Sequence, residues 1–226
     1  MSDQPDHRII LKRCGIIFLM VGLLDIGLLF YCIRHSIPVK SSLSMIGIIG
    51  GVYLLRGNLR TAAFMQWGSV FLSTLLISWL LILPWLLPGS LVALAVRLNP
   101  LTVPVGLAFV FTLIGAFLWT ARDLGSEPVA HARAEIGRKP IRVRFPLLFG
   151  ALLPVIATGL FVALQSSAVG QRAVAEARED QGPEYRYFLT GIHCTWNAEE
   201  SWYLGKVTAW DDHEIVELQV SWREAR

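Results

Sequence analysis

Long apolar runs that contain almost no charged residues constrain the fold of this chain more than any other feature. A helix rises about 1.5 Å per residue, so about 20 apolar residues cross the ~30 Å hydrocarbon core of a bilayer. Four windows of this length and one shorter window contain a single charged residue, Asp25. The short window, residues 43–55, reaches the required length when it is extended back to residue 37. The sequence therefore predicts five membrane-spanning helices, at residues 15–33, 37–55, 62–83, 100–120 and 145–165.

The composition agrees with a membrane protein, and the basic residues indicate its orientation. Hydrophobic residues make up 54% of the chain and charged residues 16%. The N-terminal tail, the turn at residues 56–60 and the loop at residues 121–144 hold 11 Lys and Arg, against 3 in the two alternate loops. Cytoplasmic loops carry such an excess. We therefore expect an inner (cell) membrane protein with a cytoplasmic N-terminus and periplasmic residues 168–226. The net charge of +3 then reflects topology and does not indicate nucleic-acid binding.

Residues 168–226 change character and predict a separate α+β domain. Its first apolar residues have helical spacing, compatible with a helix that continues from the fifth span without a break: Val169, Ala173, Val174 and Ala177. Apolar and polar residues then alternate in residues 216–223, which predicts a strand, and residues 185–195 and 201–210 predict two more. The expected fold is an α-helical multi-span membrane domain, residues 1–167, followed by a helix and a three-stranded antiparallel sheet.

Asp25 is the candidate functional residue within the membrane. A charged residue near the middle of a span costs about 2.5–3.5 kcal/mol on the insertion scale, but the apolar residues of this span outweigh it. One interpretation places Asp25 in the bundle interior, on a proton or ion path. The other is structural: a protonated or hydrogen-bonded acid that ties its helix to Ser44, Ser69, Ser73 or Thr74. No second ionisable residue lies in the apolar windows to complete a relay, which favours the structural interpretation.

Gly47 and Gly51 lie four residues apart in the second span. Glycines at this spacing let another helix backbone approach closely. They indicate either packing inside the protein, against the first or third span, or association of two copies of the chain.

Two segments between the spans have interpretations of their own. Residues 90–98 are apolar but too short to cross a bilayer, so we expect a helix lying at the outer interface, with Trp85 nearby as an anchor. A re-entrant loop lining a pore is the alternative. In the basic loop, residues 121–144, Arg133 and Arg138 could meet lipid phosphates, although keeping the topology is a sufficient role.

The tryptophans of the C-terminal domain carry its clearest indication of binding. Four of the eight fall there: Trp196, Trp202, Trp210 and Trp222. On the second predicted strand, Trp202, Leu204 and Trp210 share one face, and Tyr203, Val207 and Ala209 share the other. Apolar side chains on both faces of this strand therefore have to be buried. Either the helix and another subunit cover the two faces, or the indole rings contact the membrane surface or a partner. Trp202 and Trp210 are accordingly candidate binding residues, and a compact aromatic core is the alternative.

The cysteines and the acidic cluster predict neither a metal nor a cofactor site. Cys32 and Cys194 fall on the same side of the membrane in the expected topology, which allows a disulfide, although free thiols are the simpler interpretation. His193 and Cys194 are adjacent and point to opposite faces of a strand, so they do not ligate one ion together. The cluster Asp211, Asp212, His213 and Glu214 is typical of a solvated turn between strands.

The sequence contains no nucleophile elbow, HExxH motif or other catalytic pattern. We therefore hypothesise a non-catalytic membrane protein whose extracytoplasmic domain binds a partner protein, self-associates or assists assembly of a membrane complex. The alternative is an oligomeric transporter or channel for a small solute or ion, with Asp25 in the membrane path. The bilayer is the other expected partner in both cases.

Overall fold

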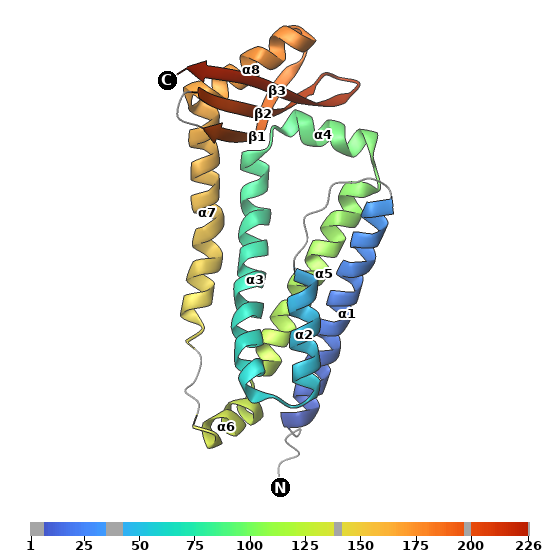
Figure 1. Cartoon of the computed structure of the whole chain (residues 1–226). Coiled ribbons are helices and arrows are strands. Elements are labelled where there is room, and N and C mark those ends of the chain that lie inside the picture. Colours follow the sequence, from blue (N-terminus) through green and yellow to red (C-terminus); the bar gives the residue numbers. More distant parts are fainter. Residues whose placement is uncertain (1–6, 35–42, 138–141, 197–199, 226) are drawn as a thin grey trace. The chain divides into compact units, whose positions relative to one another are not determined.

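The computed structural model describes residues 7–34, 43–137, 142–196 and 200–225 (Figure 1). These residues form eight helices and three strands: α1 (His7–Arg34), α2 (Leu43–Leu55), α3 (Leu59–Leu86), α4 (Gly89–Leu98), α5 (Thr102–Leu124), α6 (Glu127–Glu135), α7 (Arg144–Ser166), α8 (Ala168–Gln181), β1 (Arg186–Trp196), β2 (Glu200–Trp210) and β3 (Ile215–Ala225). The chain forms two compact units. The first comprises Met1–Trp79 and Ala108–Leu153, and the second comprises Leu80–Leu107 and Pro154–Arg226.

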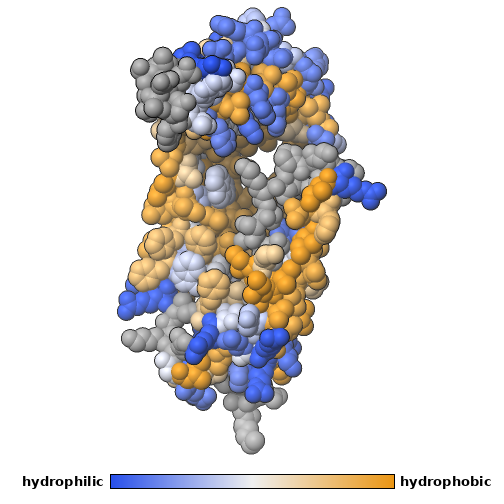
Figure 2. Space-filling model, in the orientation of Figure 1, coloured by the Kyte–Doolittle hydropathy of each residue, from blue (hydrophilic) through white to orange (hydrophobic). Residues whose placement is uncertain are grey.

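Three helices in the described part of the chain are long and apolar enough to cross a membrane: Leu59–Leu86, Val103–Leu124 and Arg144–Ser166. They correspond to the third, fourth and fifth predicted spans. Hydrophobic side chains cover the long helices on the face drawn in Figure 2, as expected for surfaces that meet lipid. These helices support a membrane protein. The first two predicted spans fall in α1, which has 28 residues, and α2, which has 13. Residues 37–42 of the predicted second span lie outside the described residues. The prediction of five membrane-spanning helices is therefore not confirmed.

Glycines hold α2 against α1 within the first unit. A Cβ atom added at Gly51 would lie 2.8 Å from the Gly15 carbonyl oxygen, and one added at Gly15 would lie 2.9 Å from the Gly51 oxygen. At Gly47 the nearest atom would be the Phe18 carbonyl oxygen, at 3.4 Å. The predicted packing of Gly47 and Gly51 against the first helix is therefore confirmed. Gly50 faces the other way, against the Met65 side chain of α3.

Arg133 lies in the interior of the first unit, which excludes the suggested contact between this side chain and lipid phosphates. Only 5% of its surface is exposed. Its Nη1 donates to Gln66 Oε1 at 2.8 Å and its Nη2 donates to the Leu124 carbonyl oxygen at 2.7 Å. The reason is the tight connection at Gly125 and Ser126, which folds α6 back on the ends of α3 and α5. Arg138 lies outside the described residues.

The sheet of the second unit has the order β1-β2-β3, with both pairs antiparallel, which confirms the predicted three-stranded meander. Helix α8 packs on one face of it. The buried core between them is apolar: Ala173, Ala177, Leu189, Val207, Val220 and Trp222. Gly205 allows this close approach, because a Cβ atom there would lie 3.0 Å from Ala173 Cβ.

The chain breaks between α7 and α8, which contradicts a helix that continues without interruption. Ser167 adopts an extended conformation, with φ −69° and ψ 157°, and its side chain accepts a hydrogen bond from the Gly170 amide at 3.1 Å. A serine in this position satisfies an amide that would otherwise lack a partner at the start of a helix. The break lets α8 leave the axis of α7.

Candidate functional site

The candidate residues predicted from the sequence belong to two different units of the structure. Trp202 and Trp210 belong to the sheet of the second unit, and Asp25 lines a cavity in the first unit.

Trp202, Leu204 and Trp210 share one face of β2, as predicted, and this face points away from α8. The opposite face carries Val207, which packs in the core with α8, and strand alternation places the even-numbered residues on the other side. The uncovered face of β2 therefore carries the two candidate tryptophans.

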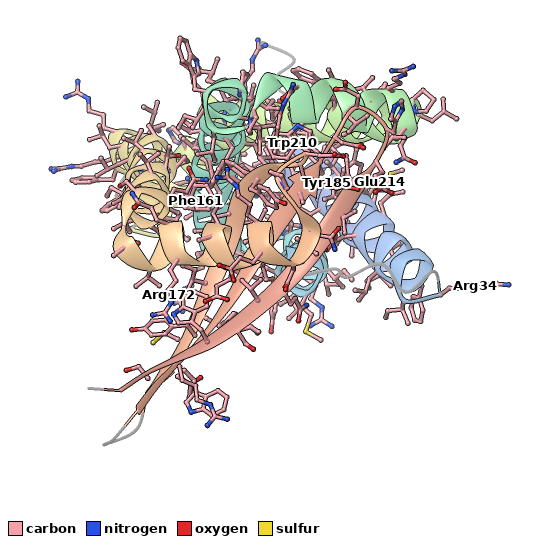
Figure 3. All side chains as sticks on the ribbon, turned by 90° about the horizontal axis from the view of Figure 1, so that it is seen from above. Arg34, Phe161, Arg172, Tyr185, Trp210 and Glu214 are labelled. Atoms are coloured by element: carbon pink, nitrogen blue, oxygen red, sulfur yellow. The ribbon has the colours of Figure 1, made fainter. Side chains whose placement is uncertain are left out.

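The two tryptophans have different surroundings. Trp210 is only 4% exposed, and its Nε1 donates to the Ser90 hydroxyl of α4 at 3.3 Å. On the same face, Phe188 of β1 packs against Phe161 of α7, with ring centroids 5.8 Å apart; Figure 3 labels Phe161 and Trp210. Helices α4 and α7 therefore cover this end of the face, and Trp210 has a structural role there.

The other end of this face forms an open groove around Trp202, which is 41% exposed. All three strands line it: His193, Thr195, Trp202, Tyr203, Leu204, Lys206, Gln219 and Ser221. The Arg223 guanidinium carbon lies 3.6 Å from the centroid of the Trp202 ring. Such cation–π contacts contribute about 0.5–1 kcal/mol at exposed sites and orient both groups. The groove thus combines an accessible indole, an aliphatic side chain and basic groups.

Residues 211–214, with the sequence Asp-Asp-His-Glu, form a turn in the described structure. The Asp211 carboxylate accepts hydrogen bonds from the amides of His213 and Glu214, both at 2.7 Å, and these bonds lower the pKa of Asp211. Tyr185 Oη donates to Glu214 Oε1 at 2.5 Å, and this bond raises the pKa of Tyr185 to about 12. Figure 3 shows Tyr185 and Glu214 next to each other. The cluster closes the β2–β3 connection.

Within the described residues, no group of three His, Cys, Asp or Glu side chains could hold a metal ion. His193 lines the groove, whereas Cys194 pairs with Tyr203 in the register of the sheet. Cys194 is a free, exposed thiol. The side chain of Cys32 lies outside the described residues, so a disulfide between the two remains a sequence-based hypothesis.

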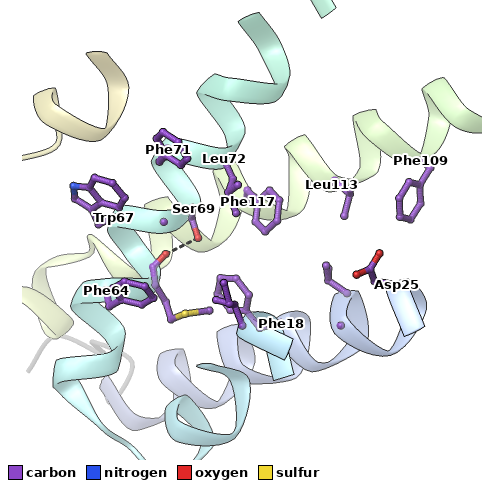
Figure 4. Close-up of a pocket in the computed structure, with 16 residues that line it drawn as sticks. Phe18, Asp25, Phe64, Trp67, Ser69, Phe71, Leu72, Phe109, Leu113 and Phe117 are labelled. Carbon is purple, nitrogen blue, oxygen red and sulfur yellow. Dashed lines mark hydrogen bonds between the residues drawn. The ribbon is translucent and has the colours of Figure 1, made fainter. Parts of the chain in front are cut away.

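Asp25 lines an apolar cavity of about 280 Å³ in the first unit. Helices α1, α2, α3 and α5 contribute its lining: Phe18, Val21, Gly22, Asp25, Ile46, Gly47, Phe64, Met65, Trp67, Gly68, Ser69, Phe71, Leu72, Phe109, Leu113 and Phe117. Figure 4 shows Asp25 at one end, near Phe109 and Leu113, and Trp67 and Ser69 toward the other.

The hydroxyl groups considered as partners of Asp25 donate elsewhere. Ser69 donates to the Met65 carbonyl oxygen at 2.7 Å, and its hydroxyl lies 3.2 Å from that of Thr120. Ser73 and Thr74 both donate to the Val70 carbonyl oxygen, at 3.0 and 2.8 Å. Their hydrogens are thus used within α3. The side chain of Ser44 lies outside the described residues.

This cavity was not predicted from the sequence, although the sequence of α3 contains a pattern that indicates it. Phe64, Trp67 and Phe71 recur at intervals of three and four residues, so they share one face of the helix, with Gly68 among them. Large aromatic side chains around a glycine leave space beside it. Whether the neighbouring helices fill that space cannot be predicted from the spacing of these residues alone.

Comparison with protein-family models, characterised proteins and solved structures found no match for this chain.

Proposed function

We propose that this chain is a non-catalytic membrane protein with five spans, whose helix-and-sheet domain lies on the periplasmic side of the inner membrane and binds a partner protein. Binding there would assist assembly of a membrane complex. The observation that carries the proposal is the groove around Trp202, which leaves an indole 41% exposed on a structured sheet.

The five-span topology is supported by the pairing of α1 with α2. Helix α1 has 28 residues, enough to cross the bilayer. Helix α2 packs on it through Gly47 and Gly51, as a second, shorter span would. The distribution of 11 Lys and Arg against 3 supports a cytoplasmic N-terminus.

The groove indicates the chemistry of the partner. Lys206 and His193 line it, and Arg223 lies over the Trp202 ring, whereas Glu217 is the acidic residue on this face of β3. Tryptophan and arginine are the residues that most often dominate binding energy at protein interfaces. The matching partner is a protein segment with an apolar side chain for the indole and acidic residues beside it.

The test is co-purification of the full-length protein from membranes in mild detergent. Trp202→Ala combined with Lys206→Glu should reduce the partner protein at least tenfold, because both the apolar and the charged contact are lost. The control is Glu179→Lys on α8, an exposed residue outside the groove, which should leave recovery unchanged. A chain lacking residues 171–226 should still insert but recover no partner; recovery of the same proteins without the domain would refute the proposal.

A second candidate function is transport of a small solute or ion by an oligomer, with Asp25 in the path. The observation that favours it is the position of Asp25 in the lining of the membrane cavity. In reconstituted vesicles, Asp25→Asn should reduce flux at least tenfold, because it removes the one ionisable group among the described residues of the cavity lining. Unchanged flux would show that Asp25 takes no part in transport, which would contradict this function.

A further inference from the structure

The cavity beside Asp25 has the chemistry of an apolar site with one polar end. Six aromatic side chains surround it: Phe18, Phe64, Trp67, Phe71, Phe109 and Phe117. Among the described residues of the lining, Ser69 carries the only hydroxyl, and this hydroxyl already donates to the Met65 carbonyl oxygen. Buried water needs two to four polar partners, whereas apolar cavities stay dry and take up apolar molecules. Apart from the Asp25 carboxyl group at one end, the lining therefore offers water few hydrogen-bond partners.

We propose that this cavity binds a single-chain amphiphile, with its apolar chain among the aromatic rings and a hydrogen-bonding alcohol or amine group at Asp25. The size of the ligand follows from the volume. A cavity of about 150 Å³ admits benzene, and this one measures about 280 Å³. It therefore takes a chain of roughly ten to twelve carbon atoms. The carboxyl group of Asp25 supplies the polar contact at one end of the cavity (Figure 4). The site does not depend on the groove of the second unit.

Gly68 makes the proposal testable by a cavity-filling substitution. It lines the cavity, and a Cβ atom added there would meet no atom within 4 Å. Gly68→Leu should therefore occupy the space of the ligand without displacing the backbone. Gly115→Leu on α5 is the matched control, because a Cβ atom there also meets nothing within 4 Å but Gly115 does not line the cavity.

The reporter is Trp67, which lines the cavity. Full-length protein in detergent is titrated with 11-bromoundecan-1-ol, whose bromine quenches tryptophan fluorescence on contact. The Trp67 signal is obtained by difference from Trp67→Phe. We expect saturable quenching of Trp67, weakened at least tenfold in Gly68→Leu and unchanged in Gly115→Leu. The same chain without its hydroxyl group, 1-bromoundecane, should bind at least fivefold more weakly, and Asp25→Leu should abolish that difference.

Three results would overturn the proposal. One is equal quenching in Gly68→Leu and in the wild-type protein. Another is equal binding of the bromoalkane and the bromoalcohol. The third is saturable quenching of Trp67 by a phospholipid with brominated acyl chains that undecanol does not displace, which would identify the occupant as an ordinary bilayer chain. If Gly68→Leu does not fold, judged by circular dichroism, Leu113→Trp fills the cavity from α5 and replaces it. None of these results bears on partner binding by the sheet.

Discussion

Arg133 is a buried cation held by two neutral groups, the Gln66 side chain and the Leu124 carbonyl. Burial lowers its pKa, because a low-dielectric environment disfavours the charged form. Its Nε atom has no hydrogen-bond partner among the described residues. The two bonds it does make therefore fasten α6 to the ends of α3 and α5.

Arg133→Leu should destabilise the first unit by roughly 2–4 kcal/mol, because it leaves two buried acceptors without a donor. Thermal unfolding in detergent, followed by circular dichroism, measures the loss. Arg122→Leu, at an exposed position in the last turn of α5, is the control and should change little. In a double-mutant cycle, Gln66→Leu and Arg133→Leu should be non-additive; additive losses would show that the bond between them contributes nothing.

The Tyr185–Glu214 pair gives the C-terminal domain a response to alkaline pH. The folded pKa of Tyr185 is about 12, above the usual value of about 10. The neutral hydroxyl is the donor, so the stabilisation is complete below about pH 10 and is lost as the pH rises through about 12. Glu214→Gln should return the Tyr185 pKa toward about 10. Ultraviolet titration against a Tyr185→Phe chain measures it, and a titration unaffected by Glu214→Gln would contradict the role of this bond.

At the scale of elements, a glycine allows close packing both between α1 and α2 and between α8 and the sheet. In the first pair two backbones approach each other, and in the second a backbone approaches a side chain. Gly51 admits α1, and Gly205 admits Ala173 of α8. At Gly51 a side chain would meet a backbone carbonyl oxygen at 2.8 Å, so the helices would have to shift apart. At Gly205 it would meet Ala173 at 3.0 Å, so α8 would have to move by a few tenths of an ångström.

Gly51→Val should separate α2 from α1 and destabilise the first unit by about 1–3 kcal/mol, as overpacking does. The added Cβ atom would lie 2.8 Å from a carbonyl oxygen, which belongs to rigid helical backbone. Gly27→Val on α1 is the matched control, because a Cβ atom there meets nothing within 4 Å. The midpoint of thermal unfolding compares them, and equal midpoints would contradict the close packing.

At the scale of the whole molecule, the exposed thiol of Cys194 provides a test of topology. If the C-terminal domain lies outside, a membrane-impermeant maleimide should label Cys194 in intact spheroplasts of a Cys32→Ser chain, which lacks the other cysteine expected on that side. A further Cys194→Ser substitution should remove the label. A cysteine placed at the exposed Arg56 position, between α2 and α3, should react only after the membrane is permeabilised. Labelling of Cys194 only after permeabilisation would reverse the proposed orientation.

The sequence alone determined the class of protein, three helices able to cross a membrane, the three strands and the faces of β2, because each depends on composition or short-range periodicity. Only the tertiary structure decided which candidates are accessible. The buried side chain of Arg133 donates a hydrogen bond to a residue 67 positions away, and that of Trp210 donates to one 120 positions away. The cavity beside Asp25 likewise requires four helices. Burial and cavities arise from contacts between segments distant in the chain, and local patterns do not encode which segments meet.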